Sequence, residues 1–193
     1  MITSSANAQT YSTTFNLADF GDASGNVVDH VIDFGTPVTS IQSISVDLSH
    51  SWVADLEIGL YSPTDNQTTS TALGDVDANA SYILHTDEGG GDDIGLGGET
   101  LADVLTYTFV APGTTGTTLG TAAGNPIPAG TYDAETWGSG GVGAGWRFVL
   151  TDDFGGDDGA IGNVTINFTS VPEPASATFL LGLTALIGVR RRR

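Results

Sequence analysis

The chain has 193 residues, of which 23 are Asp or Glu, five are basic and none is Cys, for a formal net charge of −18 at pH 7. Without Cys there are no disulfides, thiolate metal sites or Cys nucleophiles, and a surface this acidic repels phosphate, which excludes nucleic acid as a partner. The many Gly, Ser and Thr residues favour strands and turns over helices, so we expect one all-β domain.

Residues 1–9 resemble the end of a signal peptide. Ala6 and Ala8 place small residues at alternate positions, as signal peptidase requires. Residues 1–10 lack the apolar segment of such a leader. We therefore expect the true start to lie upstream of Met1.

Residues 10–169 are predicted to form one β-sandwich. Apolar residues occupy every second position in four segments, as in strands with one buried face: 44–48, 56–60, 146–150 and 164–168. Weaker strand patterns cover residues 10–17, 26–34, 81–85, 105–110 and 131–134. Eight or nine short strands joined by Gly, Pro, Asp and Asn turns predict a jelly-roll β-sandwich. Residues 113–130 are rich in Gly, Thr and Ala and are predicted to form an exposed loop.

Two blocks of this region resemble a known family. Residues 44–64, ISVDLSHSWVADLEIGLYSPT, contain an apolar alternation, a His-Ser-Trp step, Asp-Leu, a second alternation and Ser-Pro. About a hundred residues later come a strand with the sequence GWRFVLTD at 145–152, a Gly- and Asp-rich turn at 155–159 and a last strand at 161–168. This order resembles the proprotein convertase P domain, or P/Homo B domain, except that Ala54 stands where the family usually carries Gly.

The resemblance implies a jelly roll that normally follows a subtilisin-like serine endopeptidase, stabilises it and tunes its calcium and pH dependence. The residues themselves predict no catalysis. His30, His50 and His85 lie among many Ser and Asp, but no Gly-x-Ser-x-Gly or Gly-Thr-Ser nucleophile motif is present. We expect a non-enzymatic module, although the family is associated with proteolysis.

Calcium is the predicted cofactor. It accepts six to eight oxygen ligands in flexible geometry, and a cation placed among loop carboxylates relieves their mutual repulsion. Its predicted ligands are Asp55, Asp87, Asp92, Asp93, Asp152, Asp153, Asp157 and Asp158. The alternative is that these are solvated acidic turns.

Three Trp residues allow a second kind of site. Trp146 falls on the apolar side of its alternation and is predicted to lie in the core. Trp52 and Trp137 stand at a strand start and before a Gly-rich turn, where exposed rings would stack on a sugar. A carbohydrate-binding module is therefore one alternative function.

The C-terminal tail has three parts. Residues 170–174 form a Pro-rich spacer containing Pro172, Glu173 and Pro174, and residues 175–189 are uncharged. The chain then ends in Arg190, Arg191, Arg192 and Arg193. An apolar stretch followed by cationic residues predicts a short transmembrane helix with its C-terminus in the cytoplasm. As a helix of 15 residues it would cover about 22 Å, against about 30 Å of hydrocarbon, so permanent anchoring is marginal.

These three parts resemble the PEP-CTERM sorting signal of Gram-negative bacteria. The resemblance implies recognition by an exosortase, anchoring in the inner membrane through residues 175–189, processing near the motif, and delivery to the cell envelope or extracellular matrix. We therefore predict an exported structural or adhesive protein. The alternatives are an accessory module of a secreted subtilisin-like protease and a module that binds extracellular polysaccharide.

Overall fold

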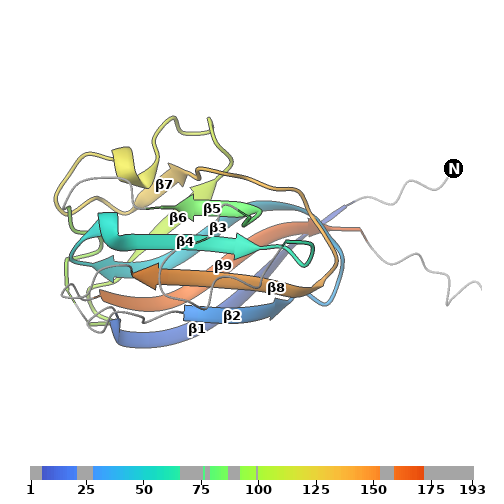
Figure 1. Cartoon of the computed structure of the whole chain (residues 1–193), viewed down its shortest axis with the longest axis horizontal. Helices are drawn as coiled ribbons and strands as arrows, with labels where there is room; N and C mark the ends of the chain where they lie inside the picture. The colour runs from blue at the N-terminus through green and yellow to red at the C-terminus, as the bar shows by residue number, and fades with distance from the viewer. Residues whose placement is uncertain are drawn as a thin grey trace, which may run out of the picture.

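The computed structural model describes residues 6–20, 28–65, 76, 79–86, 92–98, 100–152 and 159–171. These residues contain nine strands and two short 3-10 helices, arranged as two layers (Figure 1). In chain order they are β1 (Asn7–Phe20), β2 (Val28–Asp33), β3 (Val38–His50), η1 (Val53–Asp55), β4 (Leu56–Tyr61), β5 (Tyr82–His85), β6 (Leu105–Val110), η2 (Leu119–Thr121), β7 (Gly130–Asp133), β8 (Ala144–Asp152) and β9 (Gly159–Ser170). The all-β prediction is confirmed, and all nine predicted segments contain a strand.

The strands form two sheets. One has the order β1-β9-β3-β6-β7 and the other β2-β8-β4-β5. Neighbours are antiparallel except β6 and β7, which pair in parallel. Because a jelly roll is built from antiparallel strands, this order does not establish it, and the jelly roll stays a prediction.

The core lies between the two sheets and follows the predicted alternation. Apolar side chains from both sheets form one buried cluster, which includes Ile44 and Ile166 from one sheet and Ile58 and Phe148 from the other. Trp146 is fully buried, as predicted, and packs edge-on against Phe34 with ring centroids 5.5 Å apart. Apolar burial of this kind is the main force that holds two sheets together.

The prediction that β4 has one buried face is wrong, because every residue of β4 is buried. On the far side of its sheet, Tyr61 and Val149 form a second apolar cluster with Val76 and Ala80. Gly59 is required there, because a Cβ atom at this position would lie 2.4 Å from Val76. Val76 and Ala80 thus cover part of a face that the alternation assigned to solvent.

The two ends of the sandwich carry different residues. Ser170, the last residue of β9, pairs with Asn7 and Val38 at the end where β1 begins and β9 ends, which we call the tail end (Figure 1). Gly159, the first residue of β9, pairs with His50 at the opposite end, which we call the loop end. At about 3.4 Å per residue, β9 holds the two ends about 40 Å apart.

Two predictions concern the tail end. Strand β1 begins at Asn7, so residues 7–9 extend the sheet rather than precede it. Within the part of the chain that the structure describes, no helix has the length and apolar character needed to cross a membrane. The predicted span, residues 175–189, lies outside the described residues, as do Pro172, Glu173, Pro174 and the Arg cluster.

The predicted loop 113–130 is mostly exposed, but two of its residues, Leu119 and Ile127, are buried in the core. Its first turn is held by Asp133 of β7. The Asp133 carboxylate accepts hydrogen bonds from the backbone N–H groups of Gly113, Thr115 and Gly116 at 2.7 to 2.8 Å, and one from the Thr115 hydroxyl at 3.0 Å. These bonds, first of all the one from the Thr115 backbone, lower the pKa of Asp133 below its ordinary value.

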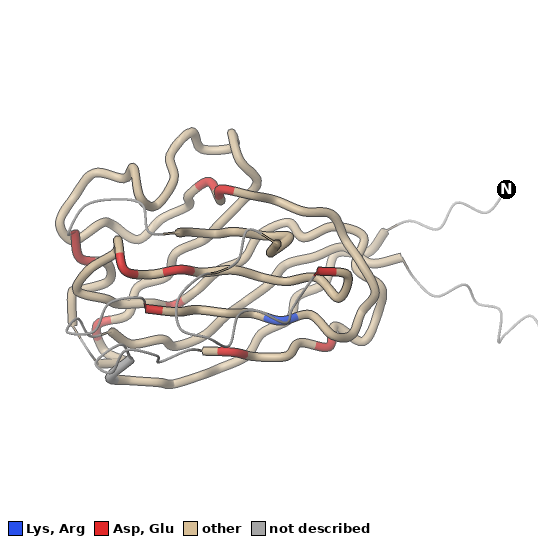
Figure 2. The backbone as a smooth tube through the Cα atoms, in the orientation of Figure 1, with Lys and Arg blue, Asp and Glu red and all other residues tan. Residues whose placement is uncertain are grey.

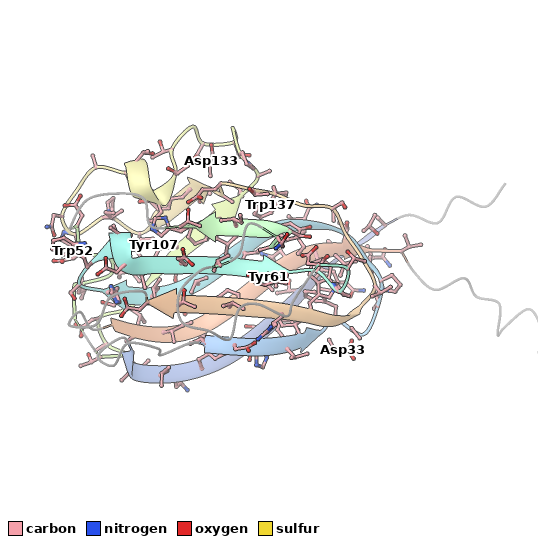
Figure 3. The ribbon with its side chains drawn as sticks, in the orientation of Figure 1. Asp33, Trp52, Tyr61, Tyr107, Asp133 and Trp137 are labelled. Atoms are coloured by element: carbon pink, nitrogen blue, oxygen red, sulfur yellow. The ribbon has the colours of Figure 1, made fainter. Side chains whose placement is uncertain are left out.

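Replacing Asp133 with Asn is expected to lower the melting temperature by about 5 °C at pH 7, because an amide cannot accept all four hydrogen bonds. A carboxyl with a lowered pKa stabilises the fold above its unfolded-state pKa and loses that effect as the pH falls. The difference in melting temperature between wild type and Asp133→Asn should therefore become smaller once the pH drops below 3.8, the ordinary pKa of Asp. Thermal melts at pH 7 and pH 3 measure it, with Asp33→Asn at the tail end as a charge-matched control (Figure 3). Equal melting temperatures for wild type and Asp133→Asn at pH 7 would contradict this role.

Candidate functional site

The loop end brings together segments that are far apart in the sequence. Strand β3 ends at His50 and is followed by η1 and β4. Strand β5 pairs with one side of β4 and ends at His85, and β8 pairs with the other side and ends at Asp152. Residues 92–98 close over the end of β3, because His50 and Ile94 exchange backbone hydrogen bonds of 3.1 and 2.9 Å. Trp52 projects from this end of the molecule (Figure 3).

His50 is fully buried at the loop end. Its Nε2 atom lies 3.7 Å from Oδ2 of Asp152, and both side chains are shielded from solvent. Its Nδ1 atom lies 2.9 Å from the carbonyl oxygen and 3.1 Å from the amide nitrogen of Trp52. The ring therefore joins the ends of β3 and β8 to the turn that carries Trp52.

His85 makes a similar connection from the end of β5. Its Nε2 atom lies 2.9 Å from the carbonyl oxygen of Val53, and its Nδ1 atom lies 3.8 Å from Oε1 of Glu135. Glu135 also accepts hydrogen bonds from the backbone and hydroxyl of Thr86, at 2.8 and 2.6 Å. Two buried His side chains, each beside a carboxylate, thus hold the backbone at residues 52–53.

Residues 92–98, which close over the end of β3, pack tightly against it. Gly95 has a φ of +69°, and a Cβ atom there would lie 2.6 Å from the Ser49 side chain. Tyr107 connects this segment to Ile127. Its hydroxyl accepts a hydrogen bond from the Gly95 N–H at 2.5 Å and donates one to the Ile127 carbonyl at 2.9 Å. Burial raises the pKa of Tyr107, so this hydroxyl stays protonated and able to donate.

Four of the eight predicted calcium ligands lie in described segments at the loop end. Asp55 and Asp152 are buried, and Asp92 and Asp93 are half-buried. Among the described residues, no three or more His, Asp or Glu side chains are grouped closely enough to hold a metal ion. Asp87, Asp153, Asp157 and Asp158 lie outside the described residues. Calcium therefore stays a prediction.

The two candidate sugar platforms differ. Trp52 is 43% exposed, whereas Trp137 packs on the core, with its ring centroid 5.1 Å from that of Tyr82 and its indole N–H donating to the Ile41 carbonyl at 3.3 Å. The expectation of an exposed ring is therefore met by Trp52 and is wrong for Trp137. The Gly-rich turn after Trp137 lies against β3, where it pairs with Val38, and this brings the ring onto the core.

The side chains that organise both His residues were not found from the sequence. Glu135 stands just after the short strand β7, without a motif, and its partners His85 and Thr86 lie about 50 residues away in the sequence. His50 belongs to the P-domain-like signature, but nothing near it in the sequence indicates Asp152. Only the sheet topology shows these pairs.

The described body is thus a two-sheet all-β domain whose last strand leads directly into the tail. The family model of the PEP-CTERM protein-sorting motif matches residues 170–193, which confirms the predicted sorting signal. The motif implies an exported protein that exosortase recognises and that is anchored in the membrane before processing. No curated protein matches the chain.

Two solved structures are similar in part. One is a serine protease of Aeromonas sobria in complex with its chaperone, at 14% identity and a TM-score of 0.34, covering 86% of this chain and 27% of that chain. The other is the serine protease of Aeromonas sobria, at 14% identity and a TM-score of 0.33, covering 85% and 27%. The chain thus spans about a quarter of the length of these structures.

Proposed function

We propose that this chain is a non-catalytic, P/Homo B-like module that exosortase sorts to the cell envelope or extracellular matrix, where its role is structural or adhesive. The observation that carries the proposal is the position of the sorting motif. Strand β9 ends at Ser170, where the motif begins, so no further folded element separates the sandwich from its tail.

The position of the tail determines which end of the sandwich faces the membrane in the proposed arrangement. While the tail is anchored, the tail end faces the membrane and the loop end lies about 40 Å further out, at the far end of β9. Trp52 and the acidic residues at the loop end are then displayed away from the cell. A display role needs no catalytic group, only a body that keeps its shape.

The geometry of His50 supports a structural role for the residue that most resembles a catalytic base. In a Ser-His-Asp triad, one ring nitrogen faces the carboxylate and the other faces the nucleophile. Here the nitrogen opposite Asp152 lies against the backbone of Trp52. We therefore assign His50 to holding the loop end together.

Because the chain has no Cys, a single introduced thiol tests the location. A membrane-impermeant maleimide added to intact cells should label Trp52→Cys, since this side chain is 43% exposed at the loop end. Val164→Cys, buried in the core, is the matched control and should react only after denaturation. Labelling of Trp52→Cys that requires cell lysis would overturn the proposal.

We extend the proposal to calcium at the loop end, where the described part of the chain brings Asp55, Asp92, Asp93 and Asp152 from three segments to the same end. Calorimetric titration of the full chain should show calcium uptake at millimolar concentration, and chelation should lower the melting temperature. Replacing Asp92 and Asp93 with Asn should weaken uptake, whereas Asp33→Asn at the tail end should not. Absence of uptake, with melting unchanged by chelation, would contradict a calcium site.

A further inference from the structure

The outward face of the five-stranded sheet carries continuous rows of small polar side chains. The central row crosses all five strands in register, as Ser12 pairs with Thr165, Thr165 with Ser45, Ser45 with Thr108 and Thr108 with Thr131. Hydroxyl oxygens lie 3.1 Å apart between Ser12 and Thr165 and 2.9 Å apart between Ser45 and Thr108. Each of the five strands thus contributes one hydroxyl to this row.

A second row runs parallel to the first on the side toward the loop end. The Thr14 hydroxyl donates to Asn163 at 2.7 Å, the Asn163 amide donates to Asp47 at 2.8 Å, and the Thr106 hydroxyl donates to Asp47 at 2.6 Å. Asp47 is the one charged side chain in these rows, and both of its oxygens accept hydrogen bonds. Hydrogen bonding across the strands holds these side chains in a fixed arrangement.

A third row lies on the side toward the tail end. The Thr10 hydroxyl donates to Asn167 at 2.8 Å, and the Asn167 amide donates to Ser43 at 3.0 Å. We call the three rows together the hydroxyl face. With strands about 4.8 Å apart and rows about 6.8 Å apart, the face measures roughly 20 by 14 Å.

The hydroxyl face contains one charged side chain, Asp47, and no basic one. The described residues include one basic side chain, Arg147, against many acidic ones, several of which lie at the loop end (Figure 2). Arg147 itself is paired with Asp29. Anionic polymers are therefore repelled by most of the surface, while a neutral polymer is not. The rows contain no aromatic ring and no cation to bind a charged or apolar ligand.

We propose that the hydroxyl face binds a neutral polysaccharide, which identifies the adhesive partner and rests on the function proposed above. Ser and Thr hydroxyls both donate and accept, as sugar hydroxyls do, and each keeps hydrogen-bonding capacity beyond its bond within the row. Because the rows are already ordered, binding costs little side-chain entropy. Many copies displayed side by side would add avidity to weak single contacts.

A second copy of the chain fits this face less well. The hydroxyl face covers roughly 300 Å², whereas a stable protein interface buries about 800 Å² on each partner. Such interfaces also have an apolar centre, which these rows lack. A flat polar face of this size suits an extended polymer better than a folded protein.

Binding of the full chain in mild detergent to insoluble cellulose and starch, with alginate beads as the anionic comparison, tests the proposal. The variant Ser45→Ala/Thr108→Val/Thr165→Val removes three central hydroxyls with little change in side-chain size, and it should raise the apparent Kd about tenfold. The control Trp52→Ala removes the exposed ring and should change the Kd less than twofold. Thermal melts check that both variants are folded.

Amide shift mapping of the wild-type chain gives a readout that does not depend on the variants. A soluble neutral β-glucan should perturb residues 43–47 and 163–167 rather than those around Trp52. No binding to either neutral polymer, tighter binding to alginate, or loss of binding in Trp52→Ala alone would overturn the inference. Since the purified chain is used, failure here with normal surface labelling of Trp52→Cys would leave the proposed location intact.

Discussion

Replacing Trp146 with alanine is expected to lower the free energy of unfolding by about 4 kcal/mol, the range found when a buried Trp or Phe is truncated. Trp146 is fully buried, packs against Phe34 and Tyr82, and donates its indole N–H to the Val142 carbonyl at 2.6 Å. Alanine would leave a cavity between the sheets and an unpaired carbonyl. Urea unfolding followed by circular dichroism measures the change.

Trp52→Ala is the matched control, because it removes the same side chain from an exposed position. Its effect should stay within about 0.5 kcal/mol, as is usual for surface substitutions. If Trp146→Ala cost less than about 1 kcal/mol, the packing of the two sheets described above would be wrong.

The second large effect is expected from His50→Ala, which should destabilise the fold by about 3 kcal/mol. Truncating a fully buried ring leaves a cavity, which typically costs about 3 to 5 kcal/mol for an aromatic side chain, and it removes the contacts of Nδ1 with the Trp52 backbone. It also removes the contact between Nε2 and the Asp152 carboxylate, 3.7 Å away. His30→Ala is the control, since His30 is half-buried and its Nε2 lies 3.1 Å from the Tyr11 hydroxyl.

A double-mutant cycle measures the interaction between His50 and Asp152 separately from their other contacts. The variant His50→Ala/Asp152→Ala should cost less than the sum of the two single changes, by about 1 to 3 kcal/mol, because the contact between the two side chains is lost only once. Additive effects would show that the two side chains do not interact, and that the loop end is held by other contacts.

Much of the fold could be predicted from local patterns. The sequences of strands β3, β4, β8 and β9 contain strict apolar alternations, which indicate a strand with one face toward a core. Even the four-residue strands β5 and β7 could be found, since turn residues surround a short apolar pattern. The sorting signal could be identified completely because its three parts are adjacent in the sequence.

Other features could not be predicted because they depend on contacts between distant residues. The far face of β4 is covered by Val76, and no local pattern indicates which segment returns to cover a sheet. His85 and Glu135 are 50 positions apart in the sequence and meet only through the strand order. The rows of the hydroxyl face likewise require the register of five strands, whereas the alternation showed only that these residues point outward.

The central claim is that an acidic two-sheet body is exported and then separated from its C-terminal tail. Fractionation of cells with intact-mass analysis tests it most directly, on the wild type and on a Pro172→Ala/Pro174→Ala variant. We expect wild-type protein in the envelope or medium, shortened at its C-terminus near the motif, and the variant retained in the inner membrane at full length. Wild-type protein found in the cytosol with residues 170–193 still attached would contradict the account.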